Sequence, residues 1–207
     1  MTINFPALPA FTLSLSRPAS GDVSDATDTV LLIFTEDARL LAGARLFRPC
    51  RGDAFLLPPE TPAFLYPEKN EARALRILLP TALLRTLVPR VLLASATGGA
   101  MLALQDPWED ALTHIEATDA LAFFSFLSTI TQACVVTDTR ELPLPRCVRK
   151  ALARLCECGS TSVEPKALAS LCGVSESTLL RALRAHLSLT PRKYAKLVQN
   201  AHQKKAP

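Results

Sequence analysis

The fold of the carboxyl-terminal third is decided by residues 165–194, PKALASLCGVSESTLLRALRAHLSLTPRKY. Apolar residues recur at helical spacing on both sides of Gly173, a residue that can take a positive φ and end a helix. Ser175 follows as a good N-cap for a second helix. Two short helices joined by such a turn predict a helix-turn-helix. The inner faces are expected to hold Leu168, Ala169 and Cys172 on the first helix, Val174 in the turn, and Leu179, Ala182 and Leu183 on the second.

The outward face of the second helix, at about residues 175–186, carries residue types that contact DNA. Ser177, Arg181 and Arg184 fall at i, i+4 and i+7, and no carboxylate interrupts this stripe. Arg181 can donate two hydrogen bonds to guanine, and Leu180 can meet a thymine methyl group. Glu176 can accept from a cytosine amino group or complement the helix dipole, and Arg184 is either a phosphate contact or a solvated charge. The candidate DNA-binding residues are Ser175, Glu176, Ser177, Thr178, Leu180, Arg181, Arg184, Arg192 and Lys193.

Geometry alone leaves an alternative open, because an αα-hairpin without a nucleic-acid role has the same helix pattern. The next element, LTPRKYAKLV (189–198), predicts a helix with Thr190 as N-cap, Pro191 at the first position and Tyr194 turned inward. A helix-turn-helix followed by [S/T]-P-x-x-Y resembles the DNA-binding region of the AraC family of bacterial transcription regulators. The resemblance covers about residues 145–203. One departure is Ser188, where the family usually carries glycine, which implies a slightly different helix end.

This resemblance implies a sequence-specific DNA-binding transcription regulator. Family members normally carry two helix-turn-helix units, and this chain is expected to carry only the first of them. Because specific sites usually need two such units, a homodimer on double-stranded DNA is expected. The alternatives are a truncated regulator that binds DNA poorly and modulates a full-length paralogue, or a small-molecule-binding module whose DNA region is vestigial. RNA polymerase and a small-molecule effector are further candidate partners.

Charge and periodicity set the same region apart from the rest of the chain. Residues 145–207 hold 12 Lys and Arg against three acids, a net charge of +9, whereas residues 1–144 carry −5. This asymmetry is expected when one domain contacts a polyanion. The segment PRCVRKALARLCEC (145–158) predicts an amphipathic helix with a basic exterior and a buried face of Val148, Ala151, Leu152 and Leu155.

The amino-terminal part predicts a small β unit, so the fold class is α+β. Strands are expected at 29–34, at 54–57 after the Gly52-Asp53 turn, and at 72–80, with a strand pair or bulged strand around Gly43 in 39–47. Pro58, Pro59 and Pro62 should interrupt the ladder. Residues 48–65 resemble the cupin-like sensor half of the AraC family, although relatives often place glycine at Glu60 and histidine at Ala63.

The expected domains are a cupin-like sensor unit at 1–80, a helical dimerisation region at 81–140 and the helix-turn-helix domain at 145–207. Helices are expected at 81–88, 108–115 and 119–136, and a linker at 137–145.

Several classes of protein are disfavoured by what the sequence lacks. No secretory signal opens the chain, and the apolar run 120–136 is short and interrupted by polar residues, so we expect a cytoplasmic protein without a membrane segment. The six cysteines contain no C-x₂-C pair, and residues 1–100 contain no histidine, so neither a metal site nor a metal-dependent cupin is expected. No nucleophile–base arrangement, paired carboxylates or phosphate-binding glycine loop is present, so we expect no catalytic residues, no cofactor and no enzyme.

Overall fold

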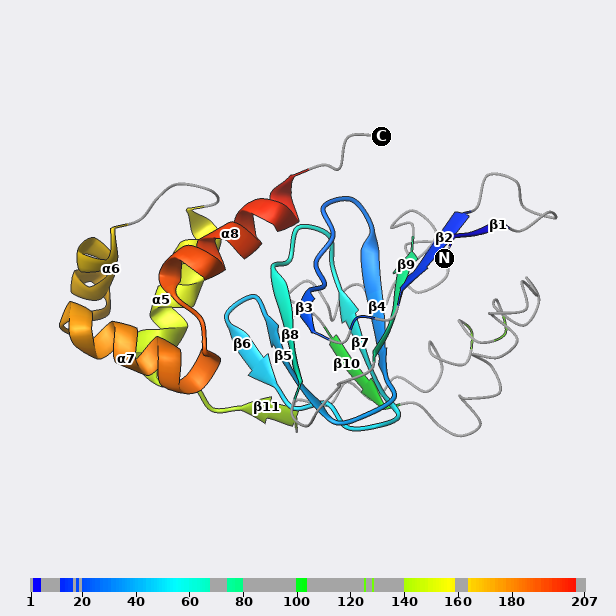
Figure 1. The fold of residues 1–207 in the computed structure, drawn as a ribbon, viewed down its shortest axis with the longest axis horizontal. Coiled ribbons are helices and arrows are strands. Elements are labelled where there is room, and N and C mark those ends of the chain that lie inside the picture. The colour runs from blue at the N-terminus through cyan, green and yellow to red at the C-terminus, as the bar shows by residue number, and fades with distance from the viewer. Residues whose placement is uncertain are drawn as a thin grey trace.

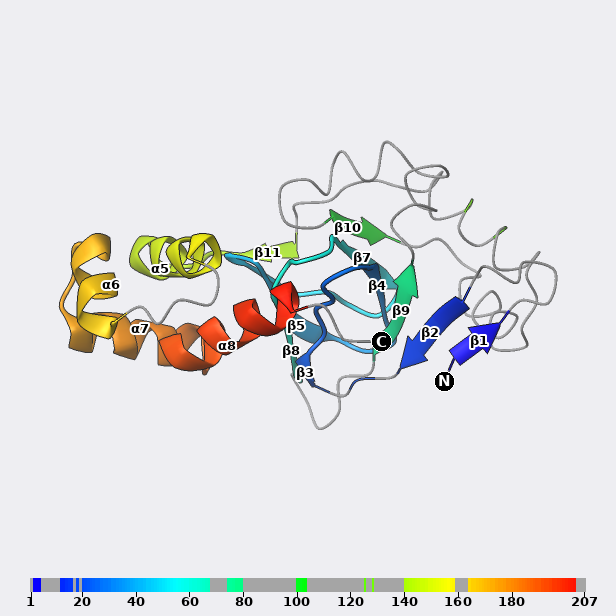
Figure 2. The same ribbon diagram turned by 90° about the horizontal axis from the view of Figure 1, so that it is seen from above.

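The computed structural model describes residues 2–4, 12–16, 18, 20–67, 74–79, 100–103, 125, 128, 140–158 and 164–203. In these ranges the chain forms two antiparallel sheets followed by four helices, which confirms the predicted α+β class (Figure 1). The helices gather at one end of the β region, and Figure 2 shows the same arrangement from above. The expected helices at 81–88, 108–115 and 119–136 lie outside the described residues, apart from the helical Ser125 and Ser128.

The first sheet has six strands in the order β1-β2-β9-β4-β7-β10. The second has five, in the order β11-β6-β5-β8-β3. Their bounds are β1 Thr2–Asn4, β2 Thr12–Ser16, β3 Gly21–Asp22, β4 Thr29–Phe34, β5 Ala38–Ala42, β6 Arg45–Phe47, β7 Asp53–Leu57, β8 Ala63–Pro67, β9 Ala74–Leu79, β10 Ala100–Ala103 and β11 Glu141–Leu142.

Large apolar side chains from both sheets form one core. Phe34 and Phe55 of the first sheet and Leu40 and Phe47 of the second are buried in the same cluster. The rings of Phe47 and Phe55 meet edge to face with centroids 4.8 Å apart. β4, with the sequence TVLLIF, is buried along its whole length, as its apolar run predicts.

The predicted strands at 29–34, 39–47, 54–57 and 72–80 are present as β4, the β5–β6 hairpin, β7 and β9, whereas six further strands were not predicted: β1, β2, β3, β8, β10 and β11. Residues 39–47 form the hairpin β5–β6, with Gly43 at φ +54 in its turn. The prolines do interrupt the ladder, because residues 58–62 belong to no strand. The ladder resumes at β8, which pairs with β5 and β3 and was not predicted.

Residues 140–145 differ from the expected linker. Glu141 and Leu142 form β11, which pairs with β6, and the Arg45 guanidinium donates to the Glu141 carboxylate at 2.6 and 2.8 Å. Leu144 is buried. This part of the chain is therefore fixed to the sheet, because a two-residue pairing and an ion pair compensate for its polar, proline-rich sequence.

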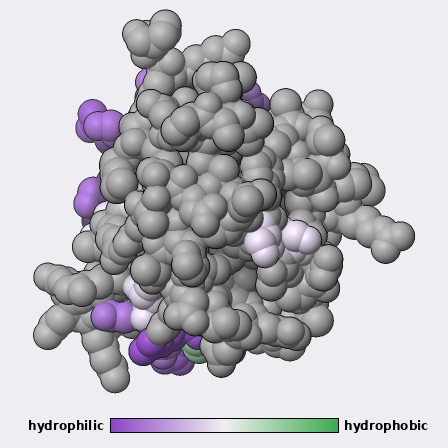
Figure 3. Space-filling model, turned by 90° about the vertical axis from the view of Figure 1, so that its right-hand side faces the viewer, coloured by the Kyte–Doolittle hydropathy of each residue, from purple (hydrophilic) through white to green (hydrophobic). Residues whose placement is uncertain are grey.

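The four helices are α5 (Arg146–Glu157), α6 (Pro165–Cys172), α7 (Glu176–Leu187) and α8 (Pro191–His202). The buried residues of α5 are Val148, Ala151, Leu152 and Leu155, as the periodicity predicts. On the side of the molecule away from these helices, the described residues that reach the surface are mostly hydrophilic (Figure 3). None of the helices in the described ranges is long and apolar enough to cross a membrane.

Candidate nucleic-acid interface

The turn between α6 and α7 has the geometry that the sequence predicts. Gly173 ends α6 in the left-handed conformation at φ +72. The backbone N–H groups of Gly173 and Val174 donate to Ser170 and Ala169 carbonyls at 3.0 and 3.1 Å. Val174 packs against the helical core. These bonds satisfy the end of the first helix and fix where the second begins.

The start of α7 is held by a cluster of hydroxyl groups. Ser175 is the N-cap, and its Oγ accepts from the Thr178 N–H at 3.2 Å. The same Oγ lies 3.0 Å from Ser177 Oγ and 2.8 Å from Thr178 Oγ1. Ser175 and Thr178, which are candidate DNA contacts, therefore also form the N-terminal cap of α7. Glu176 is exposed in the first turn, where a carboxylate complements the helix dipole.

The two faces of α7 differ sharply in exposure. Leu179, Leu183 and Leu187 are buried against the other helices. On the opposite face, Arg181 and Arg184 are exposed. A shallow hollow in this face is lined by Ser177, Leu180, Arg181, Arg184 and Ala185, and no acidic residue lines it among those that the structure describes. The structure thus brings four of the candidate residues together in one open, cationic surface, which we call the α7 face.

Arg192 and Lys193 lie on a different element, the first turn of α8. Thr190 Oγ1 accepts from the Lys193 N–H at 3.2 Å, Pro191 occupies the first turn, and Tyr194 is buried, all as predicted. Arg192 and Lys193 are exposed, but Lys193 lines a separate hollow beside β8 and not the α7 face.

Two non-glycine residues in the described ranges have positive φ, Glu60 at +62 and Ser188 at +49. Ser188 ends α7 in the left-handed conformation, and its N–H donates to the Arg184 carbonyl at 3.0 Å. Both are positions where the family that the sequence resembles usually carries glycine. The backbone here adopts the conformation that glycine favours, with a Cβ present.

Three cysteines of the helical region, Cys147, Cys156 and Cys172, pack against its apolar core. Burial raises the pKa of Cys156, although a hydrogen bond with the Tyr194 hydroxyl acts in the opposite direction. Burial also raises the pKa of Cys172. Thiols of this kind are protonated at neutral pH and act as small apolar side chains. Among the described residues, no three His, Cys, Asp or Glu side chains are grouped so that they could hold a metal ion.

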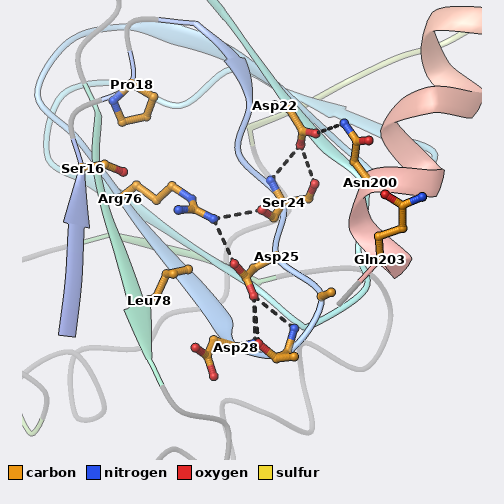
Figure 4. A pocket seen from close by; sticks show the side chains of 12 residues that line it. Ser16, Pro18, Asp22, Ser24, Asp25, Asp28, Arg76, Leu78, Asn200 and Gln203 are labelled. Atoms are coloured by element: carbon orange, nitrogen blue, oxygen red, sulfur yellow. Dashed lines mark hydrogen bonds and ion pairs between the residues drawn. The ribbon is translucent and has the colours of Figure 1, made fainter. Parts of the chain in front are cut away.

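A second cavity, of about 530 Å³, lies between the loop 22–28 and the end of α8 (Figure 4). The Asn200 amide donates to the Asp22 carboxylate at 3.0 Å, and the Arg76 guanidinium donates to the Ser24 carbonyl at 2.9 Å. Arg76 also forms an ion pair with Asp25 at 3.3 Å. Of these bonds, the one between Asn200 and Asp22 joins α8 to the β region. These residues come from three segments that are distant in sequence, so no local motif marks them.

Neither a protein-family model nor a curated protein sequence matches the chain. Among solved structures, ToxT from Vibrio cholerae is similar over 89% of this chain and 97% of that chain, with 10% identity and a TM-score of 0.38. The AraC-like transcriptional activator CuxR is similar over 92% of this chain and 77% of that chain, with 14% identity and a TM-score of 0.43. With TM-scores below 0.5, these likenesses establish neither family nor function.

Proposed function

We propose that the chain is a sequence-specific, DNA-binding transcription regulator of the AraC family. The observation that carries this proposal is the α7 face: a helix held by a well-formed helix-turn-helix exposes Arg181 and Arg184 around a hollow without a carboxylate. The two positive-φ residues add support, since Glu60 and Ser188 stand where the family usually needs glycine. A regulator of this kind acts in the cytoplasm and needs no catalytic group.

The proposed contacts divide into base contacts and phosphate contacts. Arg181 has the donor geometry for guanine, Leu180 offers an apolar surface to a thymine methyl group, and Ser177 can donate or accept. Arg184, Arg192 and Lys193 are phosphate contacts. The Ser175 cap fixes the start of α7, so that Ser177, Leu180 and Arg181 enter the major groove in one register.

Charge supports the same partner. The region 145–207 carries +9 and the remainder −5, so the field of the protein directs a polyanion to its helical end. Binding driven by phosphate contacts falls steeply with salt, because each contact releases condensed counterions.

A single helix-turn-helix reads about one major groove, and specific sites usually combine two. We therefore propose a homodimer, with residues 1–80 as the sensor unit, 81–140 as the dimerisation region and 145–207 as the DNA-binding domain. RNA polymerase is the proposed partner of the bound complex.

The test is a mobility shift of the full chain on a random duplex pool, at several salt concentrations. Arg181→Ala is expected to weaken binding about tenfold or more and to relax one base position. Arg154→Ala is the matched control: it removes the same charge from an exposed arginine of α5 that is paired with Glu157. No shift at low salt, or equal effects of the two variants, would contradict the proposal.

A second candidate function is the binding of a small-molecule effector. One observation favours it: a hollow of about 390 Å³ between β8 and α8, lined by Phe64, Tyr66, Ser188, Leu189, Lys193, Lys196, Leu197 and Asn200. The buried Tyr66 hydroxyl has no hydrogen-bond partner in the part of the chain that the structure describes.

The two remaining alternatives make different predictions. If the chain is a small-molecule-binding module with a vestigial DNA region, Arg181→Ala leaves the activity of the protein in the cell unchanged. If the chain modulates a full-length paralogue, it forms a stable complex with that paralogue and gives no shift alone at low salt.

A further inference from the structure

One tyrosine hydroxyl joins the β region to the helix-turn-helix. Tyr194 of α8 donates to the Gly43 carbonyl, in the β5–β6 turn, at 2.7 Å. The same hydroxyl lies 2.9 Å from Cys156 Sγ, at the end of α5, where the thiol can donate to it. Tyr194 is 1% exposed, so water does not compete for these bonds. Three segments that are distant in sequence therefore meet at one buried atom.

An apolar core surrounds this hydroxyl and is continuous between the two regions. Leu41 and Leu46 of the β5–β6 hairpin and Tyr66 of β8 are buried in the same cluster as the inner faces of the helices. The members of this cluster from the helical region are Val148, Ala151, Leu152, Leu155, Leu168, Ala169, Leu179, Leu183, Leu187, Leu189 (between α7 and α8), Tyr194, Leu197 and Val198. Separating the regions would expose this surface to water, which opposes any hinge motion between them.

The chain is also fixed on both sides of the helical unit. Before α5, β11 is paired with β6 and Arg45 is bonded to Glu141. Near the end of α8, Asn200 bonds to Asp22 in the β region. Figures 1 and 2 both show α8 running from α7 to the sheet. Neither the entrance nor the exit of the helix-turn-helix is a flexible tether.

We propose that the β region and the helix-turn-helix bind DNA as one rigid body, in which Tyr194 is the positioning residue for α7. This inference rests on the proposed function, including the homodimer. In a flexibly tethered dimer, the two reading helices would adapt to half-sites at several separations. In a rigid dimer, the contact between the two chains, proposed at residues 81–140, fixes both the distance and the angle between the two α7 faces.

If the two regions are rigidly coupled, the affinity of the dimer for DNA depends on the spacing of the half-sites. Half-sites must lie on one face of the duplex, at a separation set by the helical repeat of about 10.5 base pairs. Moving one half-site by about five base pairs turns it to the opposite face. A rigid dimer then loses its second contact, and with it the gain from bivalency, about a hundredfold or more.

The experiment is selection of binding sites by the full chain from a random duplex pool, followed by affinity measurements on a series of spacings. The wild type is expected to select paired half-sites at one separation and to bind about a hundredfold more weakly when five base pairs are inserted. Tyr194→Phe removes only the hydroxyl. It is expected to select the same half-site sequence over a broader range of separations, and its loss of affinity on the insertion is expected to be about two- to tenfold smaller than that of the wild type.

Each outcome decides something different. No enrichment of any sequence would defeat the proposed function itself. Enrichment of half-sites at scattered separations, or of unpaired half-sites, would overturn the rigid body while leaving DNA binding intact. An unchanged spacing preference in Tyr194→Phe would overturn the positioning role of Tyr194. Circular dichroism melts establish that this variant folds; if it does not, Asn200→Ala tests the second attachment of α8, the exposed contact with Asp22, and a smaller broadening is expected; an unchanged spacing preference there would overturn the role of that attachment.

Discussion

Replacing Ser188 by glycine is expected to stabilise the protein without altering the α7 face. Ser188 has φ +49 and ψ +22, and its N–H closes the end of α7 on the Arg184 carbonyl. For a residue with a Cβ, this left-handed conformation is strained by about 1–2 kcal/mol. Glycine has no such strain, but it loses about 0.5–1 kcal/mol more in backbone entropy on folding. The difference between the midpoints of these two ranges is a gain of about 0.75 kcal/mol in the free energy of unfolding.

For a chain of this size, that gain corresponds to a rise in melting temperature of about 1–4 °C, which thermal unfolding followed by circular dichroism can resolve. Ser188→Ala is the matched control, because it removes the hydroxyl and keeps the Cβ. The alanine variant is expected to melt no higher than the wild type. If alanine and glycine stabilise equally, the hydroxyl and not the backbone conformation is the source of the cost, and the reasoning fails.

Four further predictions follow from the same contacts. Arg181→Lys keeps the charge without the paired donors, so binding should persist while discrimination at one base falls by about 1–3 kcal/mol, measured by competition between duplexes that differ at that base. Leu180→Ala should weaken binding about three- to fivefold on a thymine-containing site, but not on the same site with uracil, because only thymine carries the C5-methyl group; equal losses would refute the contact. Cys156 should react with iodoacetamide at pH 8 more slowly in the native than in the urea-unfolded protein, because burial raises its pKa, and mass spectrometry of the alkylated peptide measures this. Burial pushes the pKa of Asp25 upward, but the Thr27 and Asp28 amides and Arg76 outweigh it and lower the pKa overall. The Asp25 carboxylate therefore stabilises the fold at pH values above its unfolded-state pKa, and this stability is lost as the pH falls through its folded-state pKa. Over that pH range, the free energy of unfolding of Asp25→Asn should decrease less than that of the wild type.

The helix-turn-helix could be predicted from sequence because its determinants are local. Gly173 ends one helix, and Ser175 and Thr190 cap the next two, through bonds to residues at most four positions away. Apolar spacing then fixes which face of each helix is buried. All of this information lies within about ten residues of where it acts.

The attachment of that unit to the sheet could not be predicted in the same way. Tyr194 and Gly43 are separated by 151 positions, and nothing in either local sequence specifies the other. β11 is a two-residue strand in a proline-rich segment, so its local sequence is typical of a linker. Pairing with β6 and the bond between Arg45 and Glu141 outweigh that tendency, and both require the finished sheet.

If the proposed function holds, the protein does not signal by releasing the helices α6 and α7 from the β region, because release would expose the apolar core around Tyr194. A regulatory signal must then change either the oligomeric state or the tilt of α8. Because α7 is packed in the same core as α8, a change in the tilt of α8 also reorients α7. Both cavities at the junction have α8 as a wall: the acidic one at Asp22 and Asn200, and the apolar one at Tyr66 and Lys193. The two kinds of signal are distinguishable. A change in assembly leaves the affinity of one chain for a single half-site unaltered, whereas a change in the tilt of α8 shifts the preferred spacing of paired half-sites.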